Sequence, residues 1–299
     1  MELRTLRYFL EAAREENMTR AAENLHVSQP TLSKQLRKLE EELGKQLFIR
    51  HSFSIELTKE GMLLRKRAED IVAMSDKVEA EFLAMDDIVG GNIYFGCAES
   101  YQIRHLAKAI KTFKRCYPQF HYHITSGDTQ QVLERLDKGL LDFAMIVERP
   151  DEEKYHVLKM PGADRWGVVM PAGCELARKD AVSFEDLLGK PLFCSQQSWD
   201  ADIPRWCGEK QKQLQLEGTF RLSYNGSVFA KEGLGYLLTF EHLIDTSASS
   251  HLVFRPLTPL LENEMYLLWR RHQIFTPIAQ KFLEEAFRMF GERNTHGDK

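Results

Sequence analysis

The sequence predicts a mixed fold: a helical N-terminal domain, one long helix, and a C-terminal α/β domain. Three observations lead to this prediction. Apolar residues recur every three or four positions through residues 2–85, the pair Gly90-Gly91 interrupts that periodicity, and apolar strands then alternate with amphipathic helices. Because 299 residues exceed one typical domain, we expect two or three domains.

The composition is that of a globular chain, with 43% hydrophobic and 28% charged residues. The formal net charge of −4 means that any DNA-binding face must come from a local basic cluster. Apolar runs stay shorter than the roughly 18 residues of a membrane span. Five widely spaced cysteines predict reduced thiols rather than disulfides or a zinc site. We expect a cytoplasmic protein with no membrane partner, no metal and no cofactor.

The N-terminal residues predict three helices. The first covers residues 2–15, and the second runs from a cap at Thr19 to Leu25. Residues 26–27 leave room only for a tight turn. Ser28 is a suitable N-cap for a third helix, which we expect to end near Leu43, before Gly44. Together these elements make a helix-turn-helix pattern.

The predicted third helix has two faces. Leu32, Leu36, Leu39 and Leu43 form its expected buried stripe, and Ser28–Leu39 contains three basic residues and no acidic one. The first turns of such a helix meet base edges in the major groove, where Gln suits adenine and Lys suits guanine. An ordinary solvated polar stripe is the alternative. The candidate DNA contacts are Ser28, Gln29, Pro30, Thr31, Ser33, Lys34, Arg37 and Lys38.

Residues 48–58 predict a small β-hairpin, and a long helix is expected over residues 58–86. Its apolar positions follow a heptad seam, which favours pairing with the same helix of a second copy. Packing of the helix on its own domain is the alternative. The residues expected in the dimer interface are Leu64, Ala68, Ile71, Ser75, Val78, Phe82 and Met85.

The C-terminal region predicts strands at 93–97, 120–125 and 143–147, with helices at 102–116 and 129–138. Such alternation implies an α/β domain with largely parallel strands.

The segment 19–61, TRAAENLHVSQPTLSKQLRKLEEELGKQLFIRHSFSIELTKEG, resembles the signature of LysR-type transcriptional regulators. Looser landmarks follow at Tyr117-Pro118 and in segments 127–147, 182–193 and 233–238, so the resemblance covers essentially the whole chain. It implies a winged helix-turn-helix domain with Arg50 at the wing. The wing tip carries only His51 as a further cation, so strong minor-groove contact from the wing tip beyond Arg50 is not expected.

The resemblance also implies the domain plan. Residues 1–58 would bind DNA, residues 59–88 would form a dimerisation helix, and residues 89–299 would form a two-lobed effector domain resembling periplasmic binding proteins. Lobe one would comprise about 89–161 plus 266–299, and lobe two about 162–265, with crossings near Pro161 and Met265. The expected partners are double-stranded operator DNA, a small polar effector, a second copy in a homodimer that assembles into a homotetramer, and RNA polymerase as a further candidate.

The effector site is expected where strands of the α/β domain end. Ligands bind beyond the carboxyl ends of such strands, and helix N-termini there favour anions. Simple helix capping is the alternative for the hydroxyl residues. Glu99 would select a cationic or zwitterionic ligand or pair with Arg104, and Glu148 beside Arg149 poses the same question. The candidate effector contacts are Glu99, Ser100, Tyr101, Thr129, Glu148, Ser195, Gln196 and Ser227.

Two alternative functions remain open from the sequence. One is oxidant sensing through Cys194 and Cys207, and the other is DNA binding without an effector. An enzyme is not expected, because no GxSxG, HExxH, GxxxxGK[ST] or GxGxxG pattern stands out.

Overall fold

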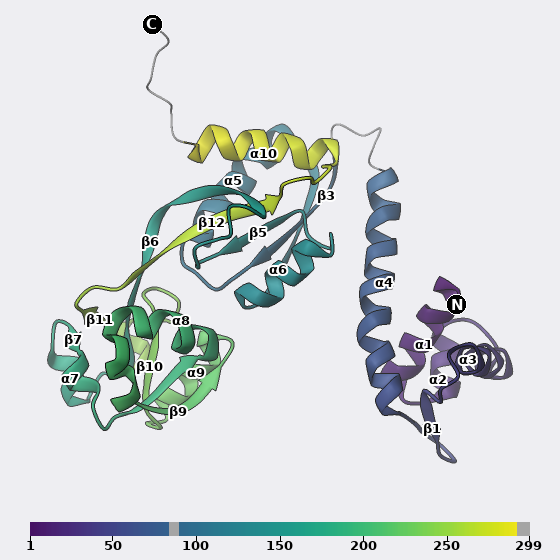
Figure 1. The fold of residues 1–299 in the computed structure, drawn as a ribbon, viewed down its shortest axis with the longest axis horizontal. Coiled ribbons are helices and arrows are strands. Elements are labelled where there is room, and N and C mark those ends of the chain that lie inside the picture. The colour runs from purple at the N-terminus through teal and green to yellow at the C-terminus, as the bar shows by residue number, and fades with distance from the viewer. Residues whose placement is uncertain (84–89, 292–299) are drawn as a thin grey trace, which may run out of the picture. The chain divides into compact units, whose positions relative to one another are not determined.

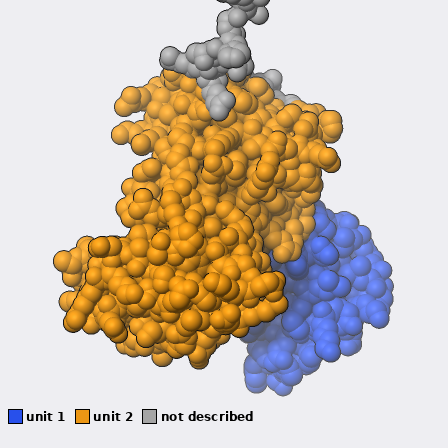
Figure 2. All heavy atoms as spheres, turned by 60° about the vertical axis from the view of Figure 1, so that its left-hand side comes forward, with its two compact units in different colours: residues 1–83 blue, residues 84–299 orange. Residues whose placement is uncertain are grey.

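The computed structural model describes residues 1–83 and 90–291, and the chain divides into two compact units, residues 1–83 and 84–299 (Figure 2). The first unit is helical with one hairpin, and the second is an α/β unit. This architecture agrees with the predicted mixed fold class. Among the described helices, none is both long and apolar enough to span a membrane.

The first unit contains the three helices, the hairpin and the long helix that the sequence predicts (Figure 1). Helix α2 begins earlier than expected because Asn17, not Thr19, is its N-cap. The Asn17 side-chain oxygen accepts hydrogen bonds from the backbone N–H groups of Thr19 and Arg20, both at 3.0 Å. The elements are α1 (Leu3–Glu15), α2 (Met18–Asn24), α3 (Gln29–Leu43), β1 (Phe48–Arg50), β2 (Ile55–Leu57) and α4 (Lys59–Leu83).

Helix α3 follows its prediction closely. Ser28 caps it by accepting a hydrogen bond from the Thr31 backbone N–H at 3.3 Å, and Gly44 ends it in the left-handed conformation at φ 64°. Three of the four predicted stripe leucines, Leu32, Leu36 and Leu39, are at most 1% exposed. They belong to a core that also contains Phe9 and Phe48. The expectation was wrong for Leu43, which is 40% exposed at the last position of the helix.

The apolar residues of helix α4 lie in two different environments, the core of the first unit and the solvent. Ala68 is 0% exposed in the core of its own unit, and Leu64 packs against that core, so we correct the expectation that these two residues face a partner. Gly61 lies so close to the preceding turn that an added Cβ would stand 2.2 Å from the Leu47 carbonyl oxygen.

The later part of α4 presents its apolar residues to solvent. Ile71, Val78 and Phe82 are 42%, 40% and 68% exposed, and Ser75 is half-buried. Met85 lies outside the described residues. Only this second half of the seam therefore remains available for a dimer interface within the described chain.

The second unit is built on one curled sheet in the order β4-β3-β5-β12-β6-β10-β8-β9, with β11 paired to β6 and β7 to β11. The strands from which a parallel arrangement was predicted are parallel, since β3 pairs in parallel with β4 and β5. The sheet as a whole is mixed, because β6 runs antiparallel to β10, β11 and β12. The parallel pairs lie at the two ends of the sheet. At one end β3 is parallel to β4 and β5, and at the other end β8 is parallel to β9 and β10. The pair Gly90-Gly91 lies inside the first strand of this sheet, not in a linker.

Two long strands join two lobes. Strand β6 pairs with β12 over its first half and with β10 and β11 over its second, so the chain passes from one lobe to the other along β6 and back along β12 (Figure 1). The first lobe comprises β3 (Gly90–Cys97), α5 (Ile103–Cys116), β4 (Gln119–Ser126), α6 (Thr129–Asp137), β5 (Phe143–Ile146) and α10 (Pro277–Phe290), and the crossing strands are β6 (Tyr155–Pro171) and β12 (Glu262–Arg270). The second lobe comprises β7 (Val182–Ser183), α7 (Phe184–Leu187), β8 (Pro191–Ser195), α8 (Gln196–Cys207), β9 (Gln215–Phe220), α9 (Ser223–Lys231), β10 (Tyr236–Phe240) and β11 (Leu252–Thr258), besides short 3-10 helices at Glu175–Arg178, Gly208–Gln213 and Ala248–Ser250.

Each lobe has helices on both faces of its part of the sheet. In the first lobe, α5 and α10 share one core with Phe95, whereas α6 packs with Ala144 and Ile146 on the other face. In the second lobe, α8 shares a core with Leu192, and α9 packs with Phe193 on the opposite face. This arrangement brings the carboxyl ends of the parallel strands toward the gap between the lobes.

Candidate DNA-reading face and ligand cleft

The exposed side of α3 carries the candidate DNA contacts. Gln29, Pro30, Lys34, Arg37 and Lys38 are all exposed, which is the opposite of the leucine stripe. The hydroxyls of Ser28 and Thr31 lie 2.7 Å apart at the start of the helix, so both are engaged in capping while remaining exposed. The face is therefore polar and basic, and its backbone is fixed by the buried stripe beneath it.

Arg50 lies on strand β1 and reaches back to α3. Its guanidinium donates to the Ser33 hydroxyl at 3.1 Å and pairs with Glu40 at 3.3 Å. Glu40 also accepts the backbone N–H groups of Leu47 and Phe48, at 2.8 and 3.2 Å. Glu40, which directly follows the acid-free segment Ser28–Leu39, thus joins the helix, the following turn and Arg50, a role that its local sequence does not indicate.

A cavity of about 910 Å³ lies between the two lobes. Its walls come from the ends of strands in both lobes, and Trp166 on β6 contributes apolar surface together with Leu238 and Phe240 on β10. The Trp166 indole N–H donates to Asn263 at 3.0 Å, which satisfies the buried polar atom of that ring. The volume lies in the range of pockets that hold small molecules.

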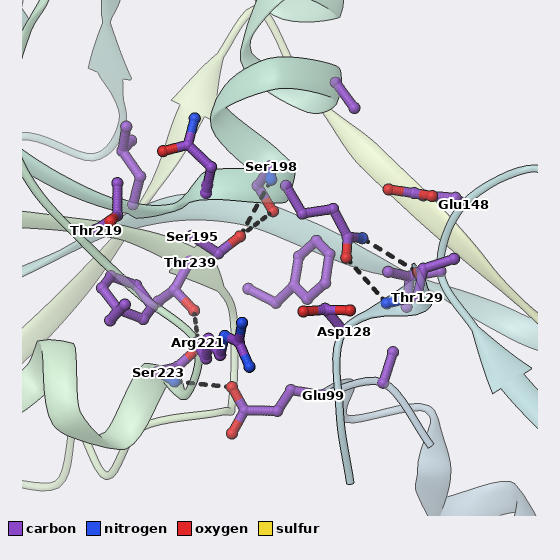
Figure 3. A pocket seen from close by; sticks show the side chains of 18 of the residues that line it. Glu99, Asp128, Thr129, Glu148, Ser195, Ser198, Thr219, Arg221, Ser223 and Thr239 are labelled. Carbon is purple, nitrogen blue, oxygen red and sulfur yellow. Dashed lines mark hydrogen bonds between the residues drawn. The ribbon is translucent and has the colours of Figure 1, made fainter. Parts of the chain in front are cut away.

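Two sets of hydrogen bonds cross this cavity from lobe to lobe (Figure 3). The Gln197 side chain on α8 accepts from the Thr129 backbone N–H at 2.9 Å and donates to the Thr129 hydroxyl at 3.1 Å. The Glu99 carboxylate, just after β3, accepts from the Ser223 backbone N–H at 2.7 Å, where α9 begins. The lobes are thus joined at the cavity as well as by their crossing strands.

Glu148, after β5, has an unusual environment in this cavity. Burial raises the pKa of its carboxyl, and the nearby charges of Asp202 and Asp128 raise it further, whereas a hydrogen bond from Gln197 lowers it. Burial also raises the pKa of Asp202, which is 2% exposed. Asp202 pairs with Arg205 at 3.0 Å, whereas for Glu148 burial is offset only by the hydrogen bond from Gln197 among the causes that act on its pKa.

The structure brings five of the eight candidate effector contacts to the cavity. These are Glu99, Thr129, Glu148, Ser195 and Gln196. The sequence missed Gln197, Arg221 and Ser223, which also line it. Gln197 immediately follows a candidate residue, but nothing in its local sequence shows that it reaches Thr129 in the other lobe.

Three candidate effector contacts lie elsewhere. Ser100 is 3% exposed and donates to the Asp164 carboxylate, and Tyr101 lines a separate cavity of about 130 Å³. Ser227 was expected where a strand ends, but it lies inside α9, which begins at Ser223, and its hydroxyl donates to the Tyr224 carbonyl at 2.7 Å. These side chains do not line the main cavity.

Arg104 does not neutralise Glu99. Its guanidinium donates to Gln102 at 3.2 Å and stands 4.6 Å from the centre of the Tyr101 ring. Glu99 is instead held at Ser223. The sequence left two possibilities for Glu99, an ion pair with Arg104 or selection of a cationic or zwitterionic ligand. The described structure does not contain the ion pair with Arg104.

The two thiols considered for oxidant sensing are not activated. Cys194 is 0% exposed, and burial raises its pKa, an effect that Asp202 reinforces. Burial also raises the pKa of Cys207, which is half-buried and donates to the Ile203 carbonyl at 3.3 Å. A reactive cysteine needs the thiolate, so these environments oppose oxidation.

Two family descriptions match this chain. "Bacterial regulatory helix-turn-helix protein, lysR family" matches residues 3–62, and "LysR substrate binding domain" matches residues 88–290. The second match alone covers more than half of the chain.

Individual relatives agree with these matches. A hydrogen peroxide-inducible genes activator of Pectobacterium carotovorum is 29% identical over 194 residues, which is 64% of this chain and 64% of that protein. The aligned part is thus less than two thirds of that relative's length. The uncharacterized HTH-type transcriptional regulator YybE of Bacillus subtilis is 23% identical over 98% of this chain and 100% of its own.

Among solved structures, the full-length regulator CbnR in complex with its target DNA has a TM-score of 0.74. It is 18% identical to this chain and covers 97% of it and 100% of its own length. At this identity the likeness shows a shared fold. The relatives described here are transcriptional regulators.

Proposed function

We propose a function from the premise that this chain belongs to the family of LysR-type transcriptional regulators. The protein would bind operator DNA through α3. It would alter that binding when a small polar effector occupies the cavity between its lobes. The cavity is the observation that carries the effector half of this proposal. It is large enough for a metabolite and is lined from both lobes, so its occupant would favour one relative position of the lobes.

The basic side of α3 supports the DNA half. Gln29 and Lys34, near the start of the helix, are the side chains proposed to read base edges, and Arg37 and Lys38 are proposed to meet phosphates. Arg50 would add a phosphate or groove contact from the wing, although Glu40 offsets part of its charge.

A homodimer is proposed through the exposed second half of α4, and a tetramer by assembly of two dimers. Ile71, Val78 and Phe82 would form the described part of the seam, because an apolar row on one side of a long helix is buried most readily against another helix. Two α3 helices would then meet two half-sites of one operator.

Oxidant sensing is the weaker alternative, because the pKa values of Cys194 and Cys207 are raised rather than lowered. We expect a Cys194→Ser, Cys207→Ser double variant to bind operator like the wild type, both before and after peroxide treatment. Loss in the variant of a peroxide response that the wild type shows would return oxidant sensing to first place.

The experiment that tests the main proposal measures both ligands on one protein. Operator selected from random DNA is titrated by fluorescence anisotropy with and without a compound that raises the melting temperature saturably. Operator and compound should change each other's affinity by the same factor, because linkage is reciprocal. A compound that binds the cavity yet alters neither operator affinity nor DNA bending would refute the proposed coupling, and an operator bound equally well without α3 cations would refute the proposed reading face.

A further inference from the structure

Carboxylates outnumber cations around the cavity between the lobes. Glu99, Asp128, Glu148 and Asp200 line it, whereas Arg221 is the single Lys or Arg among its described lining residues. In the described part of the chain, no ion pair joins any of these four carboxylates to a basic side chain. Figure 3 shows Glu99, Asp128 and Glu148 contributed by the first lobe to this one cavity. The cavity therefore has a negative potential that the protein itself leaves largely unbalanced.

Several backbone N–H groups at the helix N-termini around the cavity already have partners. The N–H of Thr129 at the start of α6 donates to Gln197 at 2.9 Å, and that of Gln131 donates to Asp128 at 2.8 Å. The N–H of Ser223 at the start of α9 donates to Glu99 at 2.7 Å. Helix N-termini ordinarily attract anionic ligands, but here the chain's own oxygen atoms, two of them from carboxylates, occupy that place.

The α8 terminus repeats this arrangement, since the Ser198 N–H donates to the Ser195 hydroxyl at 3.1 Å. A ligand carboxylate or phosphate would have to displace these bonds and would then stand beside the acidic lining.

The lining also argues for an organic cation over a metal ion. Among the described residues, no three His, Cys, Asp or Glu side chains are grouped closely enough to hold a metal. Trp166, Phe220 and Phe240 line the same cavity and offer apolar surface for a carbon skeleton. Asp128 and Glu148 line the same cavity from the first lobe, and the charge of Asp128 is one of the causes that raise the pKa of Glu148.

We propose that the effector of this cavity is a small organic amine whose ammonium group pairs with Glu148 and Asp128 while its carbon skeleton lies against Trp166 and Phe240. The inference rests on the proposed function, because it takes this cavity to be the effector site. Glu99 remains at the α9 terminus and adds negative charge, so a second ammonium group on the same molecule would be favoured there.

Matched probes of opposite charge test the proposal on the full-length protein by titration calorimetry. The pairs are 2-phenylethylamine with 3-phenylpropionate, and 1,4-diaminobutane with hexanedioate, which keep the skeleton and reverse the charge. We expect the amines to bind and the carboxylates not to bind.

Glu148→Gln and Asp128→Asn should each weaken amine binding by about tenfold to a hundredfold, the range for losing a hydrogen bond to a charged group. Glu217→Gln, an exposed glutamate on β9 outside the cavity lining, is the matched control and should leave the affinity unchanged.

Three outcomes would overturn the inference. Binding of the carboxylates without binding of the amines would overturn the inference, but it would still agree with the cavity as an effector site. Amines that bind wild type, Glu148→Gln and Asp128→Asn equally well would also do so, since the binding site would then lie elsewhere. If neither charge binds, the inference fails, and a wider set of neutral metabolites that also causes no thermal shift would remove the proposed effector function with it.

Discussion

Glu40 and Glu148 are both half-buried glutamates, but their surroundings give them opposite roles. Glu40 accepts two backbone N–H groups and pairs with Arg50, so its negative charge organises the first unit. Within residues 1–83 and 90–291, no such cation pairs with Glu148, and burial together with Asp202 and Asp128 raises its pKa. The Glu40 carboxylate thus stabilises the fold around it. The Glu148 carboxylate is the one for which we propose a cationic ligand as partner.

Lys34 should contribute more to operator binding than any side chain at the wing tip. It is exposed near the start of α3, whereas Ser52 and Phe53 carry no charge. We expect Lys34→Ala to weaken operator binding by about 1–3 kcal/mol, the value of one good base contact. Fluorescence anisotropy at fixed salt measures this change, with Lys212→Ala in the second unit as a control. Equal losses in Ser52→Ala and Phe53→Ala would contradict the expectation for the wing.

Removal of the Glu148 charge should stabilise the protein without its ligand. Because the folded-state pKa lies above the ordinary 4.5, the free energy of unfolding falls as pH rises through that raised value. We expect Glu148→Gln to melt at a higher temperature than wild type at neutral pH, and the difference to vanish below the ordinary pKa. Thermal unfolding across this pH range is the measurement, and Glu217→Gln should show no difference. A constant difference at all pH values would mean that ionisation is not its cause.

At the scale of elements, capping and close approach set the ends of helices. Asn17 begins α2 because its side chain reaches two free N–H groups, and Gly61 allows α4 to pass against the Leu47 carbonyl. Ala68, on the same helix, completes the core of the first unit. Helix α4 therefore belongs to its own unit in its first half and exposes an apolar row in its second.

The second half of α4 should control self-association. We expect a Val78→Ala, Phe82→Ala double variant to dissociate at protein concentrations where the wild type stays dimeric, because truncation removes apolar area that only a partner can bury. Sedimentation velocity across a dilution series measures this. Glu79→Ala, an exposed neighbour on the same helix, is the control. Unchanged association of the double variant would place the dimer contact on another surface.

At the scale of the whole molecule, the two lobes of the second unit are joined by strands β6 and β12 and by side chains across the cavity. The strands fix connectivity, whereas the side-chain bonds can break singly. Ligand binding would compete with or reinforce those bonds, which gives a physical link between the cavity and the relative position of the lobes.

Gln197 should measurably hold the lobes together. Its side-chain oxygen accepts the Thr129 N–H, so Gln197→Ala is expected to speed hydrogen exchange at that amide by about two- to tenfold, the effect of one hydrogen bond of net 0.5–1.5 kcal/mol. Gln196→Ala is the matched control, since the Gln196 side chain donates only to Asp200 on the same helix among the described contacts. Equal protection of the Thr129 amide in both variants would show that this bond does not join the lobes in solution.

The amino-acid sequence by itself determined the features that depend on neighbours along the chain. The α3 leucine stripe, its Ser28 cap and its Gly44 end follow from helical periodicity and capping chemistry. The exposed position of Lys34 and Arg37 follows from the same periodicity, and the family resemblance of segment 19–61 agrees with the matched helix-turn-helix description.

Only the tertiary structure decided which distant residues meet. Gln197 reaches Thr129, and Glu99 reaches Ser223, across 68 and 124 positions of the chain. Likewise, Ser100 is turned away from the cavity by Asp164 on the crossing strand. No local period encodes such contacts, because the path of β6 and β12 sets them. That path also gives the cavity its uncompensated carboxylates, and with them the charge of the ligand we propose.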